Sequence, residues 1–177
     1  MTPAATDLPP RTTPAETPYR VAVVCLGNIC RSPMADVVLT DRVETAGLGE
    51  RVEVVSAGTG GWHVGGPMDG RAAALLTTRG YDASRHVAQQ FGRHWFDEVD
   101  LVLAMDAANY ADIVAHGPRT TVRMFRDFDP CATDADRDVP DPYFGGEDGF
   151  TEVLAIVERT CDALVAAFRQ VPVGAGD

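Results

Sequence analysis

Two cysteines, an arginine and a serine lie close together in one short segment, VVCLGNICRSPMA, at residues 23–35. Five residues separate Cys25 from Arg31, and Ser32 follows directly. A thiolate is a nucleophile, a guanidinium can bind two phosphate oxygens, and a hydroxyl can donate a hydrogen bond to the thiolate. These residue types at this spacing could therefore bind an oxyanion such as phosphate and attack it from Cys25.

The residue types in this segment are also compatible with a metal site or with a purely structural turn. Cys25 and Cys30 could be half of a zinc site, but the remaining cysteines, Cys131 and Cys161, are not at ligand spacing. Four irregularly placed cysteines in a chain of 177 residues do not indicate a disulfide framework, and a reducing cytoplasm is expected. Glycine, asparagine and Ser-Pro are ordinary turn and helix-start residues. The combination of Cys-x5-Arg-Ser between a strand and a helix favours catalysis.

A nucleophile that attacks phosphorus needs an acid that protonates the leaving oxygen. Asp141 in VPDPYFGG, residues 139–146, is the candidate. Two prolines flank it and stiffen the loop, and two aromatic residues follow. Asp-Pro is also a common turn dipeptide in an acidic loop. A catalytic and a purely structural role for Asp141 both remain possible at this point.

The elements around these residues are predicted from short apolar runs that alternate with helical patterns. Buried strands are expected at residues 20–26, 52–56, 101–105 and 121–125, and helices at 32–47, 69–79, 106–115 and 150–168. Ser32 is the expected N-cap of the first helix, and Asp106 that of the third. The alternation predicts an α/β fold: one domain of three layers, with a four-stranded, mostly parallel sheet flanked by helices on both faces.

Cys25 leaves the carboxyl end of the first strand, which is where parallel sheets bind ligands. The backbone N–H groups of the following loop are expected to point at one spot, with the positive end of the next helix behind them. Gly27 and Asn28 are residues that tolerate the positive φ that such an anion-binding loop requires. The thiolate form of Cys25 is expected to be favoured there.

Composition limits the partners. A formal net charge of −11 argues against nucleic-acid binding. No run of about 18 apolar residues predicts a membrane span, and no signal peptide is evident. The absence of lysine excludes a Schiff-base lysine and a Gly-Lys-Ser/Thr nucleotide loop.

Residues 1–18 hold five of the twelve prolines and are expected to be a disordered tail. Residues 171–177 are expected to be disordered as well, which leaves residues 19–170 as the folded domain.

Two segments at opposite ends of the folded part resemble the low-molecular-weight protein tyrosine phosphatase family. VCLGNICRSPMAD is similar to that family's phosphate loop, and DPYFGG is similar to its Asp-Pro-Tyr acid loop. SAGTGGWHVGGPMDGRA, HVAQQF and DLVLAMDAAN fall where the family has similar segments. The resemblance covers residues 19–169.

The resemblance implies that Cys25 is the nucleophile, Arg31 the phosphate clamp and Asp141 the general acid, acting through a phosphocysteine without metal or cofactor. Other residues that it assigns to substrate binding are Leu26, Gly27, Asn28, Ile29, Cys30, Ser32, Trp62, Tyr143 and Phe144. Leu26 and Trp62 would flank the entrance opposite the two aromatics. Many relatives carry a second tyrosine where this chain has Phe144, so phosphorylation at that position is impossible here.

The resemblance further implies that Ser56 and His86 hold Asn28, and that Cys30 is the redox partner of Cys25. His63, His94 and His116 receive no role. The implied partners are tyrosine-phosphorylated proteins, with no nucleic acid and no membrane, and the protein is expected to be a monomer.

Two alternatives share this fold. A thioredoxin-coupled arsenate reductase needs closely spaced cysteines that pass a disulfide outward, and none occurs between Arg31 and Cys131. A non-catalytic phosphopeptide-binding module would be indicated by loss of Cys25, Arg31 or Asp141, and all three are present.

Overall fold

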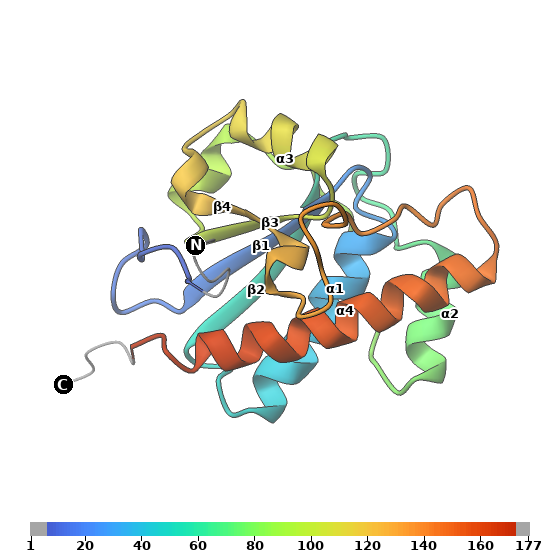
Figure 1. Ribbon diagram of the computed structural model, residues 1–177, viewed down its shortest axis with the longest axis horizontal. Coiled ribbons are helices and arrows are strands. Elements are labelled where there is room, and N and C mark those ends of the chain that lie inside the picture. The colour runs from blue at the N-terminus through green and yellow to red at the C-terminus, as the bar shows by residue number, and fades with distance from the viewer. Residues whose placement is uncertain (1–6, 173–177) are drawn as a thin grey trace.

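A four-stranded sheet forms the centre of the computed structural model, which describes residues 7–172 (Figure 1). Its strands are β1 (Tyr19–Cys25), β2 (Val52–Gly58), β3 (Leu101–Ala104) and β4 (Val122–Met124), in the order β2-β1-β3-β4. Every pairing between neighbouring strands is parallel. The four strands and the α/β class predicted from the sequence are confirmed.

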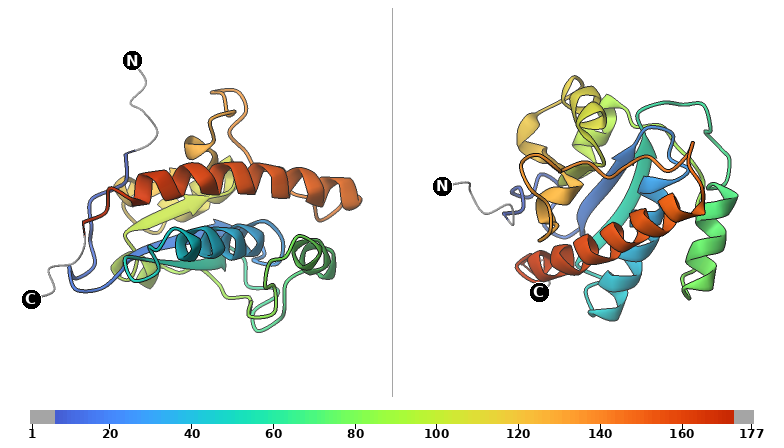
Figure 2. Two further views of the ribbon diagram at one scale, coloured as in Figure 1. Left: turned by 90° about the horizontal axis from the view of Figure 1, so that it is seen from below. Right: turned by 45° about the vertical axis from the view of Figure 1, so that its right-hand side comes forward.

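Helices cover both faces of the sheet: α1 (Arg31–Thr45), α2 (Gly70–Thr78), α3 (Ala107–Val114) and α4 (Glu147–Phe168). Side chains alternate along β1, so Val21 and Val23 pack in one apolar core with α1 and α4, and Ala22 and Val24 in a second core with α3. Figure 2 shows the sheet between α3 and the pair α1 and α4. Short 3-10 turns complete the chain at Arg93–Asp97, Arg119–Thr121 and Phe125–Phe128.

The start of α1 differs from the prediction. The helix begins at Arg31, and Cys30 rather than Ser32 is its N-cap, without a side-chain hydrogen bond. Ser32 is completely buried, and its hydroxyl turns toward Cys25 instead of toward the helix backbone. The prediction for α3 is confirmed, because Asp106 precedes it and accepts a hydrogen bond from the backbone of Asn109.

Residues 7–18 pack against the domain, which corrects the prediction of a disordered tail for this part of the chain. Pro9 is buried and its carbonyl accepts a hydrogen bond from the Tyr19 hydroxyl at 2.8 Å. The backbone N–H groups of Thr12 and Thr13 donate to Oδ1 of the buried Asp100 at 2.6 and 2.8 Å. The high proline content gave no indication of these contacts. Residues 1–6 of that prediction lie outside the described residues.

The C-terminal boundary also moves. Val171 is buried in the core, and its carbonyl accepts a hydrogen bond from the Arg51 guanidinium, although a disordered tail is predicted from this residue onward. Residues 173–177 of that prediction lie outside the described residues.

The segment between the last 3-10 turn and α4 brings distant residues to the sheet edge. It is the orange stretch of Figure 1, and it passes the carboxyl end of β3, where the Val139 N–H donates to the Met105 carbonyl at 2.7 Å. This crossing places Asp141 at the same edge of the sheet as Cys25.

Candidate active site

The loop that follows β1 has free hydrogen-bond donors. Cys25 ends the strand, α1 begins at Arg31, and the loop between them turns at the edge of the sheet. Within residues 7–172, no hydrogen bond uses the backbone N–H groups of residues 27–31. Unpaired N–H groups at a helix N-terminus form a natural anion-binding site. The loop therefore has the donors that a phosphoryl group needs.

The backbone of this loop is sharply bent at Asn28. Its φ is 56°, and it is the one non-glycine residue of the described chain with a left-handed backbone. Gly27, which also tolerates that conformation, does not adopt it. The glycine that the loop does require is Gly58, where a Cβ atom would lie 2.7 Å from the Leu26 carbonyl oxygen and 3.0 Å from the Asn28 nitrogen. The end of β2 thus has to be glycine.

Asn28 is held in this conformation by four neighbours. Its Nδ2 donates to the hydroxyls of Ser32 at 2.8 Å and Ser56 at 3.1 Å. Its Oδ1 accepts from the Gln89 backbone at 3.0 Å, and its carbonyl lies 2.7 Å from His86 Nε2. Because a carbonyl only accepts, Nε2 carries the proton. Burial lowers the pKa of His86, although the hydrogen bond to Asn28 opposes the shift. His86 can therefore serve as a neutral donor.

The two cysteines of the loop have different environments. Cys25 Sγ lies 3.0 Å from Ser32 Oγ, and a thiolate at Cys25 requires the hydroxyl to donate. Burial raises the pKa of Cys30 to about 12, and the nearby carboxylate of Asp69 acts in the same direction. Cys30 is therefore a protonated thiol at neutral pH, beside a cysteine that has a hydrogen-bond donor for its charged form.

Arg31 lies buried at the start of α1 and contacts three acceptors. Its Nη1 donates to Asp106 Oδ2 at 2.6 Å and to the Val139 carbonyl at 3.1 Å, and its Nη2 lies 3.5 Å from Asp141 Oδ2. Burial alone would lower the pKa of Arg31, but the hydrogen bond to Asp106 and the nearby charge of Cys25 raise it overall. The guanidinium thus stays charged beside Cys25.

Asp106 is a functional neighbour that sequence reasoning missed, since the sequence pattern indicated only a capping role. It follows β3 at the same sheet edge at which Cys25 ends β1. That shared position at the ends of adjacent parallel strands is the signal that could have found it.

The opposite wall comes from residues 141–145. The Asp141 side chain is 41% exposed, and its Oδ1 accepts from the Tyr143 backbone at 3.1 Å. The rings of Tyr143 and Phe144 meet edge to face at 4.9 Å. Arg71, a second residue missed by sequence reasoning, donates to the carbonyls of Tyr143 at 2.9 Å and Gly145 at 3.1 Å. Its guanidinium anchors the wall to α2.

These groups enclose a cavity of about 170 Å³. Most of the residues predicted to be catalytic or substrate-binding line it: Cys25, Leu26, Gly27, Ile29, Cys30, Arg31, Trp62, Asp141, Tyr143 and Phe144. His63, for which no role is predicted, also contributes to the lining. Asn28 and Ser32 are completely buried and do not line the cavity. Ser56 and His86 contact the loop through Asn28.

The arrangement can hold a phosphoryl group above a thiol. Unpaired N–H groups and a charged guanidinium face its oxygens, and a carboxyl group stands at the rim.

Among residues 7–172, no three His, Cys, Asp or Glu side chains are grouped so that they could hold a metal ion. None of the helices described is both long and apolar enough to cross a membrane.

Sequence comparison gives a family match. Residues 20–172 match the family model for low molecular weight phosphotyrosine protein phosphatase. A low molecular weight protein-tyrosine-phosphatase of Streptomyces coelicolor is 49% identical over 156 residues, covering 86% of this chain and 94% of the relative. Low molecular weight protein-tyrosine phosphatase A of Mycobacterium tuberculosis is 42% identical, covering 83% of this chain and 90% of that relative.

Solved structures agree with the sequence match. YfkJ from Bacillus subtilis superposes with a TM-score of 0.81 at 31% identity, covering 87% of this chain and 96% of that one. A protein tyrosine phosphatase from Entamoeba histolytica gives 0.80 at 32% identity, covering 85% and 97%. With the fold, the loop after β1 and these matches in agreement, the chain belongs to the low-molecular-weight phosphotyrosine protein phosphatase family.

Proposed function

We propose that this protein hydrolyses phosphotyrosine in protein substrates, with Cys25 as nucleophile, Arg31 as phosphate clamp and Asp141 as general acid. The observation that carries the proposal is the meeting of these three side chains in one cavity of about 170 Å³. Cys25 and Arg31 are nearly inaccessible at its floor, and the Asp141 carboxyl lies at the rim, 3.5 Å from the guanidinium.

In the first step, the Cys25 thiolate attacks phosphorus in line with the tyrosyl oxygen. A sulfur–phosphorus bond forms while the phosphorus–oxygen bond breaks, and Asp141 gives its proton to the departing phenolate. The free N–H groups of the loop and the Arg31 guanidinium stabilise the three equatorial oxygens. The product is a phosphocysteine and a free tyrosine side chain.

In the second step, Asp141 takes a proton from a water molecule, which attacks the phosphocysteine. The sulfur–phosphorus bond breaks, inorganic phosphate leaves, and the electron pair returns to Cys25 as a thiolate. Ser32 Oγ, at 3.0 Å from Cys25 Sγ, supports this leaving group by donating a hydrogen bond. Asp141 ends the cycle protonated, ready for the next substrate.

The burial of Cys25 below an exposed rim favours phosphotyrosine as the substrate. Cys25 is 2% exposed, so a substrate must reach past the rim, and a phenyl ring reaches further than the short side chain of phosphoserine. Trp62 and Phe144, which are 72% and 94% exposed, offer apolar surface to such a ring and to the residues beside it. A thiolate nucleophile supports a reducing compartment, the cytoplasm.

The test is an assay of phosphate release from a phosphotyrosyl peptide and p-nitrophenyl phosphate in EDTA. The wild type should release phosphate from both substrates, and its activity on the matching phosphoseryl peptide should be much lower. Arsenate with thioredoxin is assayed in parallel. Reduction of arsenate without phosphate release would contradict the proposal in favour of a reductase, and tight phosphopeptide binding without turnover would favour a binding module.

A further inference from the structure

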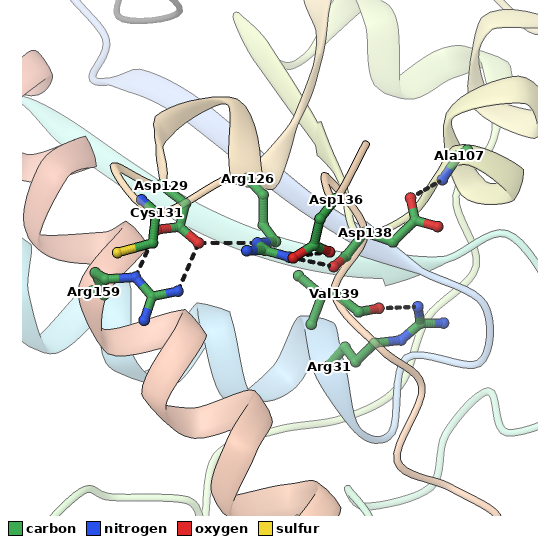
Figure 3. A network of polar contacts seen from close by, with 9 residues as sticks. All are labelled: Arg31, Ala107, Arg126, Asp129, Cys131, Asp136, Asp138, Val139 and Arg159. Atoms are coloured by element: carbon green, nitrogen blue, oxygen red, sulfur yellow. Dashed lines mark hydrogen bonds and ion pairs between the residues drawn. The ribbon is translucent and has the colours of Figure 1, made fainter. Parts of the chain in front are cut away.

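A series of polar contacts runs from α4 to the guanidinium of Arg31 through charged side chains and the backbone carbonyls of Asp138 and Val139 (Figure 3). Arg159 of α4 donates from Nε and Nη2 to the two oxygens of Asp129, at 2.6 and 2.8 Å. Arg126 Nε donates to Asp129 Oδ2 at 2.9 Å from the other side. The Asp129 side chain is fully enclosed by these partners, and the Arg126 side chain is 5% exposed. Asp129 thus binds the Arg126 guanidinium at its Nε.

The far end of the same guanidinium holds the segment that leads to Asp141. Arg126 Nη1 donates to the Asp138 carbonyl at 3.0 Å and to Asp136 Oδ1 at 2.8 Å. Asp138 also accepts a hydrogen bond from the Ala107 N–H at 3.0 Å, so its carboxylate lies at the start of α3. Arg126 therefore spans the space between Asp129 and residues 136–138.

The next residue along the chain contacts Arg31. The Val139 carbonyl accepts from Arg31 Nη1 at 3.1 Å, and its N–H donates to the Met105 carbonyl. Asp141, two residues further on, lies 3.5 Å from Arg31 Nη2. The two terminal nitrogens of Arg31 are thus both met by one short segment, and Arg126 holds that segment on its other side.

We propose that Arg126 is a positioning residue for the phosphatase reaction: through the Asp138 carbonyl it sets the place of Val139 and Asp141, and hence the plane of the Arg31 guanidinium. The inference rests on the proposed function. Arg126 itself touches neither the cavity nor any of the three proposed catalytic side chains. Its effect on the reaction passes through residues 136–141.

The geometry separates Arg126 from its neighbour Arg159. Both bind Asp129, but only Arg126 also reaches residues 136–138. Arg159 is the matched control, because Arg159→Met removes a positive charge beside Asp129 and leaves the hydrogen bond from Arg126 to the Asp138 carbonyl in place. Arg126→Lys is the sharper variant: one ammonium keeps a positive charge beside Asp129, yet it cannot reproduce the planar fork that serves Asp129 and Asp138 together.

The experiment compares wild type, Arg126→Lys, Arg126→Met and Arg159→Met after counting active sites by iodoacetate labelling of Cys25. Two quantities are measured per active site: kcat/KM for p-nitrophenyl phosphate and the inhibition constant of vanadate. We expect both Arg126 variants to lose about 10-fold to 100-fold in kcat/KM, the size of effect that a misplacement of about 1 Å can have. Vanadate should bind more weakly in the same variants, because its binding depends on the orientation of the Arg31 guanidinium and not on proton transfer.

Arg159→Met should keep kcat/KM and vanadate binding close to those of the wild type, while its melting temperature falls. A purely structural role for Arg126 predicts the same pattern for Arg126→Lys, with lower stability but unchanged kinetics per active site. That pattern would overturn the inference even if Arg126→Met fails to fold. An inactive wild type would instead contradict the proposed function itself, so the two failures are distinguishable.

Discussion

Asp106 divides its two carboxylate oxygens between a helix and Arg31. Oδ1 accepts the Asn109 N–H at 2.7 Å and caps α3, while Oδ2 lies 2.6 Å from Arg31 Nη1. The cap fixes the carboxylate, and the fixed carboxylate orients the guanidinium. One residue at the end of β3 thus links the start of a helix to the proposed phosphate clamp.

Asp106→Asn should separate these two tasks. Asparagine caps helices as well as aspartate does, so the cap of α3 should be kept. The charge-assisted hydrogen bond to Arg31 is lost, which should lower the free energy of unfolding by about 1.5–3 kcal/mol. The guanidinium also loses a partner that orients it, so kcat/KM should fall roughly 10-fold to 100-fold. Urea unfolding and steady-state kinetics test the two parts. A large loss of stability with unchanged kcat/KM would reverse the assignment.

Asp141→Asn should reduce kcat/KM according to how strongly the leaving group needs a proton. Phenyl phosphate and phosphotyrosine should lose about 10²-fold to 10⁴-fold, the usual contribution of a general acid. p-Nitrophenyl phosphate should lose much less, because nitrophenolate leaves without protonation. The measurement is kcat/KM across phenols of graded acidity. Equal losses on all substrates would mean that another group is the acid.

Mild peroxide should inactivate the enzyme through a Cys25–Cys30 disulfide. Peroxide oxidises the Cys25 thiolate to sulfenic acid, and the Cys30 thiolate then attacks that sulfur, so that a disulfide forms and the oxygen leaves as hydroxide, which takes a proton from water. Because the pKa of Cys30 is raised to about 12, only a small fraction of Cys30 is a thiolate at neutral pH. Below that pKa, the thiolate fraction grows about tenfold for each unit by which the pH rises. After oxidation and removal of peroxide by catalase, disulfide formation should therefore accelerate as the pH rises.

The control for this reaction is Cys30→Ser. This variant should keep much of its activity but, once oxidised under continuing peroxide, should not recover with dithiothreitol. Full recovery, or peptide mapping that joins Cys25 to Cys131 or Cys161, would refute the pairing.

Deletion of residues 1–13 should destabilise the domain without slowing catalysis. Thr12 and Thr13 donate to the buried Asp100 carboxylate, and their loss leaves it with the Arg20 N–H. An under-satisfied buried carboxylate costs about 1–3 kcal/mol. Asp100 precedes β3, at the end of the sheet away from Cys25, so kcat should not change. Thr13→Val, which removes one side-chain donor, should cost less. Equal stability with and without residues 1–13 would contradict the packing.

Local patterns predicted the parts of this molecule that depend on nearby residues. The alternation of apolar runs placed the strands, and the spacing of Cys25 and Arg31 placed a loop at the end of the first one. What the sequence did not reveal depends on pairings across long stretches of chain. Asp106 meets Arg31 only because β1 and β3 are adjacent. Arg126 and Arg71 act through carbonyl groups, which carry no signal in the side-chain sequence.

Which of Gly27 and Asn28 bends the loop after β1 could not be decided from the sequence, for a similar reason. Glycine tolerates positive φ in general, but here the Asn28 side chain and carbonyl find four partners that hold its backbone in that region. Tertiary contacts decided between two residues that local propensity treats alike.

The proposed reaction requires that the phosphoryl group passes from the substrate to Cys25, and trapping of that intermediate tests it most directly. Wild type and Asp141→Asn are mixed with p-nitrophenyl phosphate, quenched in acid and mapped by mass spectrometry, with Cys25→Ser as the control. We expect one phosphoryl group on the peptide that contains Cys25, with more of it in Asp141→Asn, where the base for water is missing. Cys25→Ser should bind vanadate but neither turn over nor carry that group. Substantial turnover by Cys25→Ser, or a phosphoryl group found on another residue, would contradict the mechanism.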